Sequence, residues 1–215
     1  MTYTELGEFM NIAWILLYFL VINGLEIVIF FKVDGIGLTF ERIFKAFLLK
    51  FLLGAIFATF QFLDVSEYLS YFIEPLFGIC LSFLLLRGLP KKLLFFYGLF
   101  PIVLMDLFYR SVSYFVFPFL GQGIVDGDGN PLFLLIMLFV CFIVLVFLKW
   151  LDYDFTRLRK EFLDKGFQQS LTKINWIMGA YFLVMENLSY FEYAYDIQSK
   201  TVRHLILVFY LLFFM

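Results

Sequence analysis

Four carboxylates interrupt stretches of the chain that are otherwise strongly apolar: Glu26, Glu74, Asp106 and Glu186. A charge in the hydrocarbon of a bilayer costs at least ~2.5–3.5 kcal/mol, so such residues face protein or water and mark either a functional site or a packing contact. Carboxylates in this setting can bind a proton, a metal cation or a cationic group of a ligand. Which of these they do depends on the helices that hold them.

The composition is that of a membrane protein. Of the 215 residues, 63% are hydrophobic and 16% are charged, whereas a soluble domain is roughly half apolar and about a quarter charged. Apolar runs of about the length of a span occupy 11–31, 46–63, 68–86, 93–112, 132–148 and 174–191, and 205–215 covers about half a crossing. We predict an all-α, polytopic transmembrane helical bundle with six full spans and the start of a seventh, in one domain covering 1–215. The net charge of −2 gives no reason to expect nucleic acid as a partner.

The basic residues predict the orientation of this bundle. Of the 16 Lys and Arg, thirteen fall in or beside the loops after the first, third and fifth spans, and three fall on the other side. Lys50, at the start of the second run, is counted here with the loop before it. Because cytoplasmic loops retain Lys and Arg, we predict a multi-pass chain in a cell membrane, with its N-terminus outside.

Three of the four acids share one predicted depth. At 1.5 Å per residue, Glu74, Asp106 and Glu186 lie roughly 8 to 11 Å inside the outer ends of their spans. Asn187 is the neighbour of Glu186, and Tyr190 lies one helical turn from Glu186 on the same face. We predict that these side chains line a polar pocket that opens outward and binds a ligand. The alternative is that each acid is satisfied separately by hydrogen bonds between helices; Glu26, in the inner half, is expected to be a packing or coupling residue.

The outer surface adds further candidate ligand groups, namely Glu192, Tyr193 and Asp196. Eight carboxylates and three basic residues fall on this face, so it should attract a cationic ligand. The alternative is that retention of basic residues on the inside leaves the exterior acidic without any binding role.

Two shorter patterns predict local structure. Asp106 and Arg110 are four residues apart and can pair along one helix face, with Arg110 reaching toward the outer headgroups. In the segment 149–173, apolar residues recur at helical spacing. This segment is expected to be an amphipathic helix on the inner leaflet, or else to pack against the underside of the bundle.

Enzymatic patterns are weak. Cys80 and Cys141 lie within spans, and the single histidine, His204, falls on the outer side, so a Cys–His nucleophilic pair is disfavoured. The G-x-S-x-G, H-E-x-x-H and Walker A patterns are absent. The acidic loop 126–130 begins like a calcium loop but lacks the required Gly and Glu farther on. We predict no catalytic residues, no bound metal and no cofactor.

The layout resembles a known family. The first span has the sequence NIAWILLYFLVINGLEIVIFFK, and the whole chain shares its Phe, Leu and Tyr-rich texture. With an outer N-terminus, seven predicted spans and a cytoplasmic exit, it is similar to the membrane sensor half of the peptide-pheromone histidine kinases of Gram-positive bacteria. The nearest group comprises the streptococcal sensors of competence and bacteriocin production.

This resemblance implies a homodimeric receptor for an extracellular peptide, which is often cationic and amphipathic. Binding of the peptide would shift the helices, and the last span would pass this shift to a kinase domain. The chain departs from the family because it lacks a phospho-acceptor motif and ATP-binding boxes, and His204 lies outside. We therefore expect it to be non-catalytic by itself, either as part of a longer kinase or as a truncated product that binds peptide or disturbs a full-length dimer. A response regulator is expected as a partner only if a kinase domain follows.

Two other functions compete with this one. A small transporter or immunity-type membrane protein would use Glu74, Asp106 and Glu186 as a proton or cation path and would show pH-driven flux. An intramembrane peptidase would depend on Cys80, and the absence of a nearby histidine weighs against it.

Overall fold

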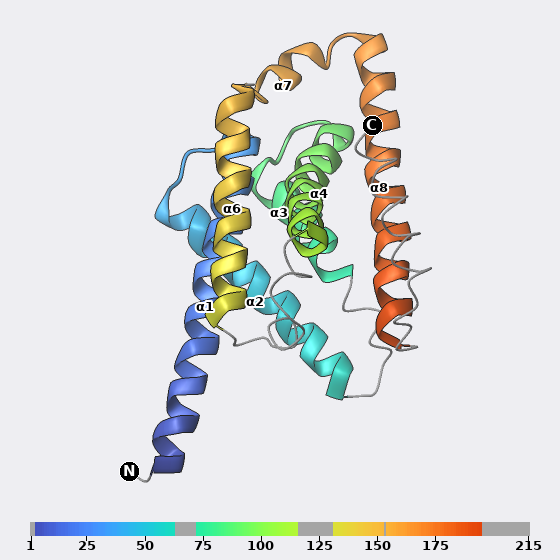
Figure 1. Cartoon of the computed structure of the whole chain (residues 1–215). Helices are drawn as coiled ribbons and strands as arrows, with labels where there is room; N and C mark the ends of the chain where they lie inside the picture. Colours follow the sequence, from blue (N-terminus) through green and yellow to red (C-terminus); the bar gives the residue numbers. More distant parts are fainter. Residues whose placement is uncertain (1–2, 63–71, 116–130, 153, 195–215) are drawn as a thin grey trace. The chain divides into compact units, whose positions relative to one another are not determined.

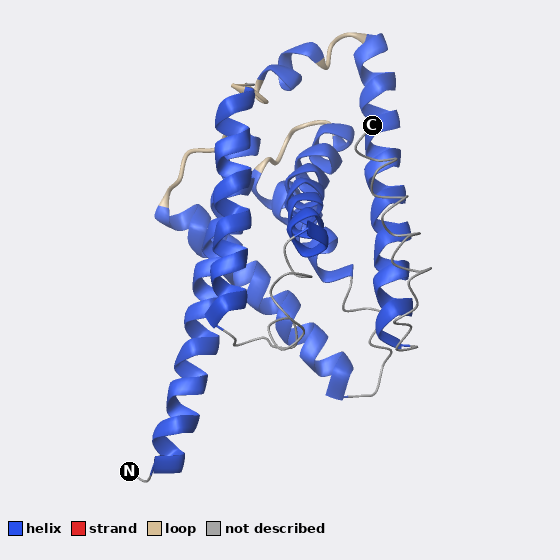
Figure 2. Cartoon of the chain, in the orientation of Figure 1, coloured by secondary structure: helices blue, strands red, loops and turns tan. Residues whose placement is uncertain are grey.

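The computed structural model describes residues 3–62, 72–115, 131–152 and 154–194. Across these ranges the regular structure consists of helices and contains no strand (Figures 1 and 2). The helices are α1 (Tyr3–Asp34), α2 (Phe40–Phe62), α3 (Ile73–Leu85), α4 (Lys91–Phe115), α6 (Pro131–Leu151), α7 (Arg157–Glu161) and α8 (Lys165–Ala194). The predicted all-α class is confirmed.

Each of the six full predicted spans overlaps one of these helices, but α3 contains only 13 residues of the predicted span 68–86. The spans 46–63 and 68–86 extend into residues outside the described ranges, and the seventh, 205–215, lies wholly outside them. Among the described residues, one helix is long and apolar enough to cross a membrane, Lys91–Val112 of α4, with a mean hydropathy of 1.6. α3 and the Leu135–Leu151 part of α6 are shorter apolar helices. These helices point to an association with a membrane.

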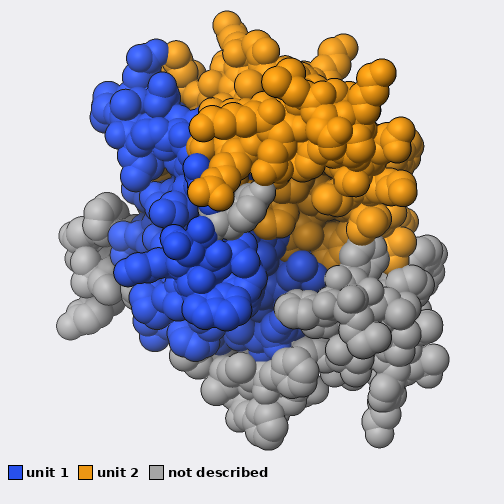
Figure 3. Space-filling model, turned by 90° about the horizontal axis from the view of Figure 1, so that it is seen from above, with its two compact units in different colours: residues 1–43, 104–154 blue, residues 44–103, 155–215 orange. Residues whose placement is uncertain are grey.

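The chain divides into two compact units (Figure 3). Unit 1 comprises residues 1–43 and 104–154, and unit 2 comprises residues 44–103 and 155–215. Both units therefore combine segments that are far apart in the sequence, and α4 contributes its first part to unit 2 and its last part to unit 1.

Apolar packing holds unit 1 together. α1 runs beside α6 (Figure 1), and Ile27, Ile29 and Phe31 of α1 are almost completely buried. Near the end of α4, Val112 forms a buried cluster with two residues of α6, Ile136 and Val140. Burial of these side chains stabilises the unit. In water the stabilisation comes from the hydrophobic effect, and in lipid it comes from close packing of the helices.

Unit 2 instead contains a direct contact between helix backbones. Gly78 of α3 faces Gly98 of α4 so closely that a Cβ added to Gly78 would collide with the Gly98 carbonyl oxygen. A Cβ added to Gly98 would lie 2.8 Å from Cα of Ile79. Beside this contact, the buried hydroxyl of Ser82 donates a hydrogen bond to the Leu94 carbonyl at 2.7 Å. Small residues at a crossing permit this close approach, as in many helix pairs within membranes.

The prediction of one amphipathic helix over 149–173 is wrong. The segment contains the end of α6, the five-residue helix α7, and the start of α8. A new helix begins after Asp164 because its carboxylate accepts a hydrogen bond from the backbone N–H of Phe167 at 3.0 Å. The part of the segment after Asp154 packs against α4 within unit 2, where Phe155 is buried and its carbonyl accepts a hydrogen bond from the hydroxyl of Tyr97 at 2.6 Å.

Candidate functional site

An ion pair joins α2 to α3 within unit 2. Nζ of Lys50 lies 2.6 Å from Oε2 of Glu74, the second residue of α3. The Lys50 side chain is 8% exposed, whereas that of Glu74 is 49% exposed. The same ammonium group lies 4.6 Å from the ring centroid of Phe77, one turn further along α3. The pair thus combines a buried cation with a half-exposed acid.

This geometry brings an ammonium group and a carboxylate into direct contact. A hydrogen bond between ionised groups is shorter and stronger than a neutral one, and the face of the Phe77 ring attracts the ammonium group of Lys50. The half-exposed carboxylate of Glu74 keeps surface that a second cation can approach.

Lys50, which is grouped by its charge with the loop and helix end before the second span, lies inside α2 and is buried. The remaining basic residues still divide twelve to three, so the predicted orientation does not change. A lysine inside the apolar run 46–63 requires a partner, and the sequence does not show that this partner is Glu74.

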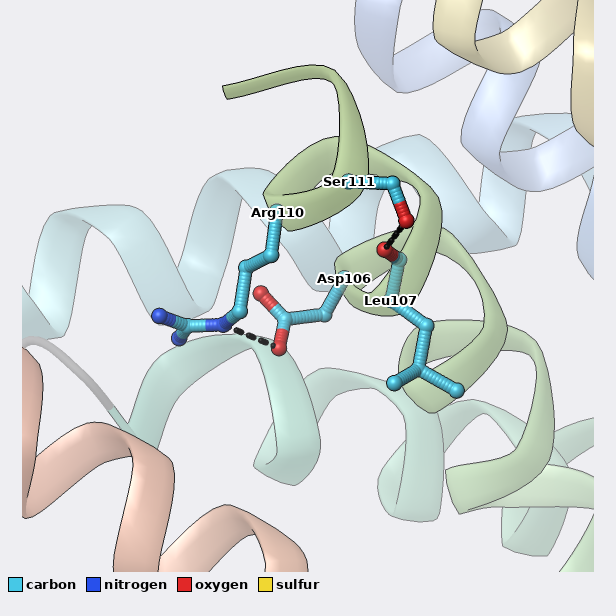
Figure 4. A network of polar contacts seen from close by, with 4 residues as sticks. All are labelled: Asp106, Leu107, Arg110 and Ser111. Carbon is cyan, nitrogen blue, oxygen red and sulfur yellow. Dashed lines mark hydrogen bonds and ion pairs between the residues drawn. The ribbon is translucent and has the colours of Figure 1, made fainter. Parts of the chain in front are cut away.

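The second charged pair lies within a single helix, α4. Nε of Arg110 donates a hydrogen bond to Oδ2 of Asp106 at 2.8 Å, and the two side chains are 16% and 18% exposed (Figure 4). On the following residues, the hydroxyl of Ser111 bonds to the carbonyl of Leu107 at 2.9 Å, also one turn back. The predicted local pair between Asp106 and Arg110 is confirmed.

All but one of the remaining predicted site residues lie near the end of α8, the last helix that the structure describes. α8 carries Glu186, Asn187, Tyr190, Glu192 and Tyr193. The side-chain amide of Asn187 donates a hydrogen bond to the Leu183 carbonyl one turn back. Asp196 lies outside the described residues.

The described contacts of Glu74 and Asp106 are with cations of the chain, not with each other. Glu74 belongs to unit 2 together with α8, whereas Asp106 belongs to unit 1, so a pocket shared by all three acids stays a prediction. In the described part of the chain, no three His, Cys, Asp or Glu side chains are grouped so that they could hold a metal ion. Cys80 and Cys141 are free thiols.

Comparison with protein-family models, with curated proteins and with solved structures gives no match for this chain. The similarity to peptide-pheromone sensors therefore stays a prediction from the sequence. The charged pairs and the helices that carry them are the basis for a functional proposal.

Proposed function

We propose that this chain is a multi-pass membrane protein of six full spans and part of a seventh, and that it serves as the sensor module of a peptide-responsive histidine kinase. Helix lengths support the multi-pass arrangement. α1, α2, α4, α6 and α8 contain 32, 23, 25, 21 and 30 residues. A helix needs about 20 residues to cross the hydrocarbon core of a bilayer.

Exposed apolar side chains give the same proposal a second support. Phe51 and Ile56 of α2, Phe142 of α6 and Leu183 of α8 are each more than half exposed. Soluble proteins rarely display large apolar patches unless they bind a partner there. In a membrane, lipid chains would cover these side chains, so that their apolar surface would not contact water.

The observation that carries the sensing function is the Lys50–Glu74 pair. A Lys or Arg side chain of an extracellular peptide can compete for the half-exposed Glu74, while Lys50 remains buried. Loss of that bond removes a contact between α2 and α3. A ligand changes the equilibrium between two helix packings only through its different affinity for each, and this exchange of partners supplies such a difference.

The orientation is tested by labelling single cysteines with a membrane-impermeant maleimide, in a background in which Cys80 and Cys141 are serine. Thr39→Cys and Ser170→Cys mark two predicted inner loops, and Ser66→Cys marks an outer one. In intact cells we expect labelling of Ser66→Cys alone, and in inside-out vesicles the reverse. Labelling of Ser66→Cys and Thr39→Cys from the same side would contradict the spans between them.

Ligand recognition is tested with the full chain in nanodiscs of phosphatidylcholine and a fluorescent amphipathic peptide of Lys and Leu. Glu74→Gln should weaken binding about tenfold, which corresponds to about 1.4 kcal/mol. Joint replacement of Glu192 and Asp196 by amides should have a smaller effect, because exposed charges contribute mainly through the long-range field.

The matched controls are a peptide with Glu in place of Lys and the variant Glu161→Gln, which removes an exposed acid from α7. The acidic peptide should not bind, and Glu161→Gln should bind the basic peptide normally. Equal binding of the basic peptide to Glu74→Gln and to the unchanged chain would refute the competition between ligand and Lys50. Acidification-driven cation flux through liposomes that is lost in Glu74→Gln would favour the transporter alternative.

A further inference from the structure

Exposed basic side chains gather on three segments of unit 2. These segments are the turn between α3 and α4 with the first residues of α4, the short helix α7, and the first part of α8. Their exposed members are Arg87, Lys91, Lys92, Arg157, Lys160, Lys165 and Lys173. We refer to these seven residues as the basic surface.

Three contacts bring the segments together in space, although they are far apart in the sequence. The side-chain amide of Asn175 on α8 donates a hydrogen bond to the Lys92 carbonyl on α4 at 2.8 Å. The hydroxyl of Tyr97 on α4 bonds to the Phe155 carbonyl just before α7. The guanidinium carbon of Arg159 on α7 lies 5.3 Å from the Tyr97 ring centroid. The start of α4 therefore holds both α7 and α8.

Acidic residues do not neutralise this surface. Residues 86–92 and 155–176 contain two acids, Glu161 and Asp164. Asp164 already accepts hydrogen bonds from the backbone N–H groups of Gly166 and Phe167 at the start of α8. The seven exposed cations thus outnumber the acids of the same segments by a wide margin.

Large apolar side chains stand among these cations. Trp176 on α8, next to Asn175, is 76% exposed, and Leu163 between α7 and α8 is 89% exposed. Exposed tryptophan beside lysine and arginine is the composition that favours the boundary between lipid headgroups and hydrocarbon. A phosphate group can accept hydrogen bonds from Arg and Lys, while Trp176 and Leu163 contact the upper part of the acyl chains.

We propose that the basic surface binds the headgroups of anionic phospholipids and so concentrates them around the start of α4 and α8. This inference depends on the proposed embedding of the chain in a membrane. Lys and Arg close to an anionic membrane are attracted to it, and salt screens this attraction. The surface therefore fixes α7 and α8 to one leaflet and makes their position sensitive to its anionic lipid content.

Trp176 provides the test, and Trp150 provides a matched control. Trp150, on α6, is 77% exposed, nearly the same as Trp176, but its neighbours in the sequence include Asp152 and Asp154 as well as Lys149. Two single-tryptophan forms of the full chain are reconstituted in vesicles of phosphatidylcholine and phosphatidylglycerol mixed at about four to one. Either lipid carries brominated acyl chains, which quench tryptophan fluorescence at short range.

For Trp176 we compare the quenching of fluorescence per mole of brominated lipid. It should be at least about twofold stronger with phosphatidylglycerol than with phosphatidylcholine, because a few basic residues near the surface attract the anionic lipid. The preference should be weaker at Trp150. It should fall to parity at Trp176 in the variant Arg157→Gln/Lys160→Gln/Lys165→Gln and at high salt.

The outcomes separate this inference from the proposal on which it depends. Equal quenching of Trp176 by both brominated lipids would overturn the lipid-binding surface while leaving the embedding intact. The same preference at Trp150 as at Trp176 would also overturn it, because the enrichment would then not belong to the basic surface. Absence of quenching at both tryptophans by either lipid would show instead that the chain does not enter the bilayer.

Discussion

The two charged pairs differ in how they are formed. Asp106 and Arg110 are four residues apart on α4, and their 2.8 Å bond requires the helix alone. Lys50 and Glu74 are separated by 24 residues and lie on different helices, so their 2.6 Å bond requires α2 and α3 to be packed correctly. The first pair lowers the free-energy cost of burying two charges. The second pair does the same, but it also depends on the relative position of α2 and α3.

The surroundings of the pairs differ in the same way. Near the end of α4 in unit 1, Val112 packs in a buried apolar cluster with Ile136 and Val140 of α6. α3 in unit 2 is fixed by backbone contact at Gly78 and by the buried hydrogen bond of Ser82. Because Glu74 lies one turn before Gly78, the interhelical pair lies close to this crossing of α3 and α4. This comparison leads to three predictions.

The largest effect is expected from Gly78→Ala. The added methyl group collides with the Gly98 carbonyl, so α3 and α4 must separate, and overpacking of this kind costs about 3 kcal/mol. Thermal unfolding in detergent, followed by far-ultraviolet circular dichroism, should show a clearly lowered midpoint. Gly54→Ala is the control, because nothing lies within 4 Å of a Cβ at Gly54 and alanine raises helix propensity by about 1 kcal/mol. An unchanged midpoint for Gly78→Ala would mean that the crossing is not close.

A smaller loss is expected from Glu74→Gln. The variant leaves the ammonium group of Lys50 buried without its carboxylate, which costs 3–5 kcal/mol for fully buried pairs and about 2 kcal/mol here because Glu74 is half exposed. The double variant Lys50→Met/Glu74→Gln removes both charges and should recover most of the stability. Denaturant titration of the four forms of this cycle measures the coupling. Additive losses would contradict a bond between α2 and α3.

The sequence predicted those parts of the molecule that depend on local spacing. Runs of apolar residues predicted the helices, and the four-residue spacing predicted the Asp106–Arg110 pair. Two contacts depend instead on how the helices are arranged, namely the contact between Gly78 and Gly98 and the bond between Lys50 and Glu74. The spacing of residues in a single sequence does not show which of several acids a lysine will reach. The segment 149–173 was predicted incorrectly because apolar periodicity persists across it, whereas the Asp164 cap and the bond from Tyr97 to the Phe155 carbonyl break the helix.

The smallest effect is expected from Asp106→Asn. The pair is local, and pairs at this spacing contribute about 0.3–0.5 kcal/mol when exposed to water. Because both side chains are mostly buried, the loss should exceed that value. Arg110 nevertheless retains a hydrogen-bond acceptor in the asparagine oxygen and can extend toward lipid headgroups, so we expect a loss of about 1 kcal/mol. Ser111→Ala, which removes the neighbouring hydroxyl bond to the Leu107 carbonyl, is the matched control. If denaturant titration instead gave a loss as large as that of Glu74→Gln, Asp106 would also hold two helices together, and the distinction between a local and an interhelical pair would fail.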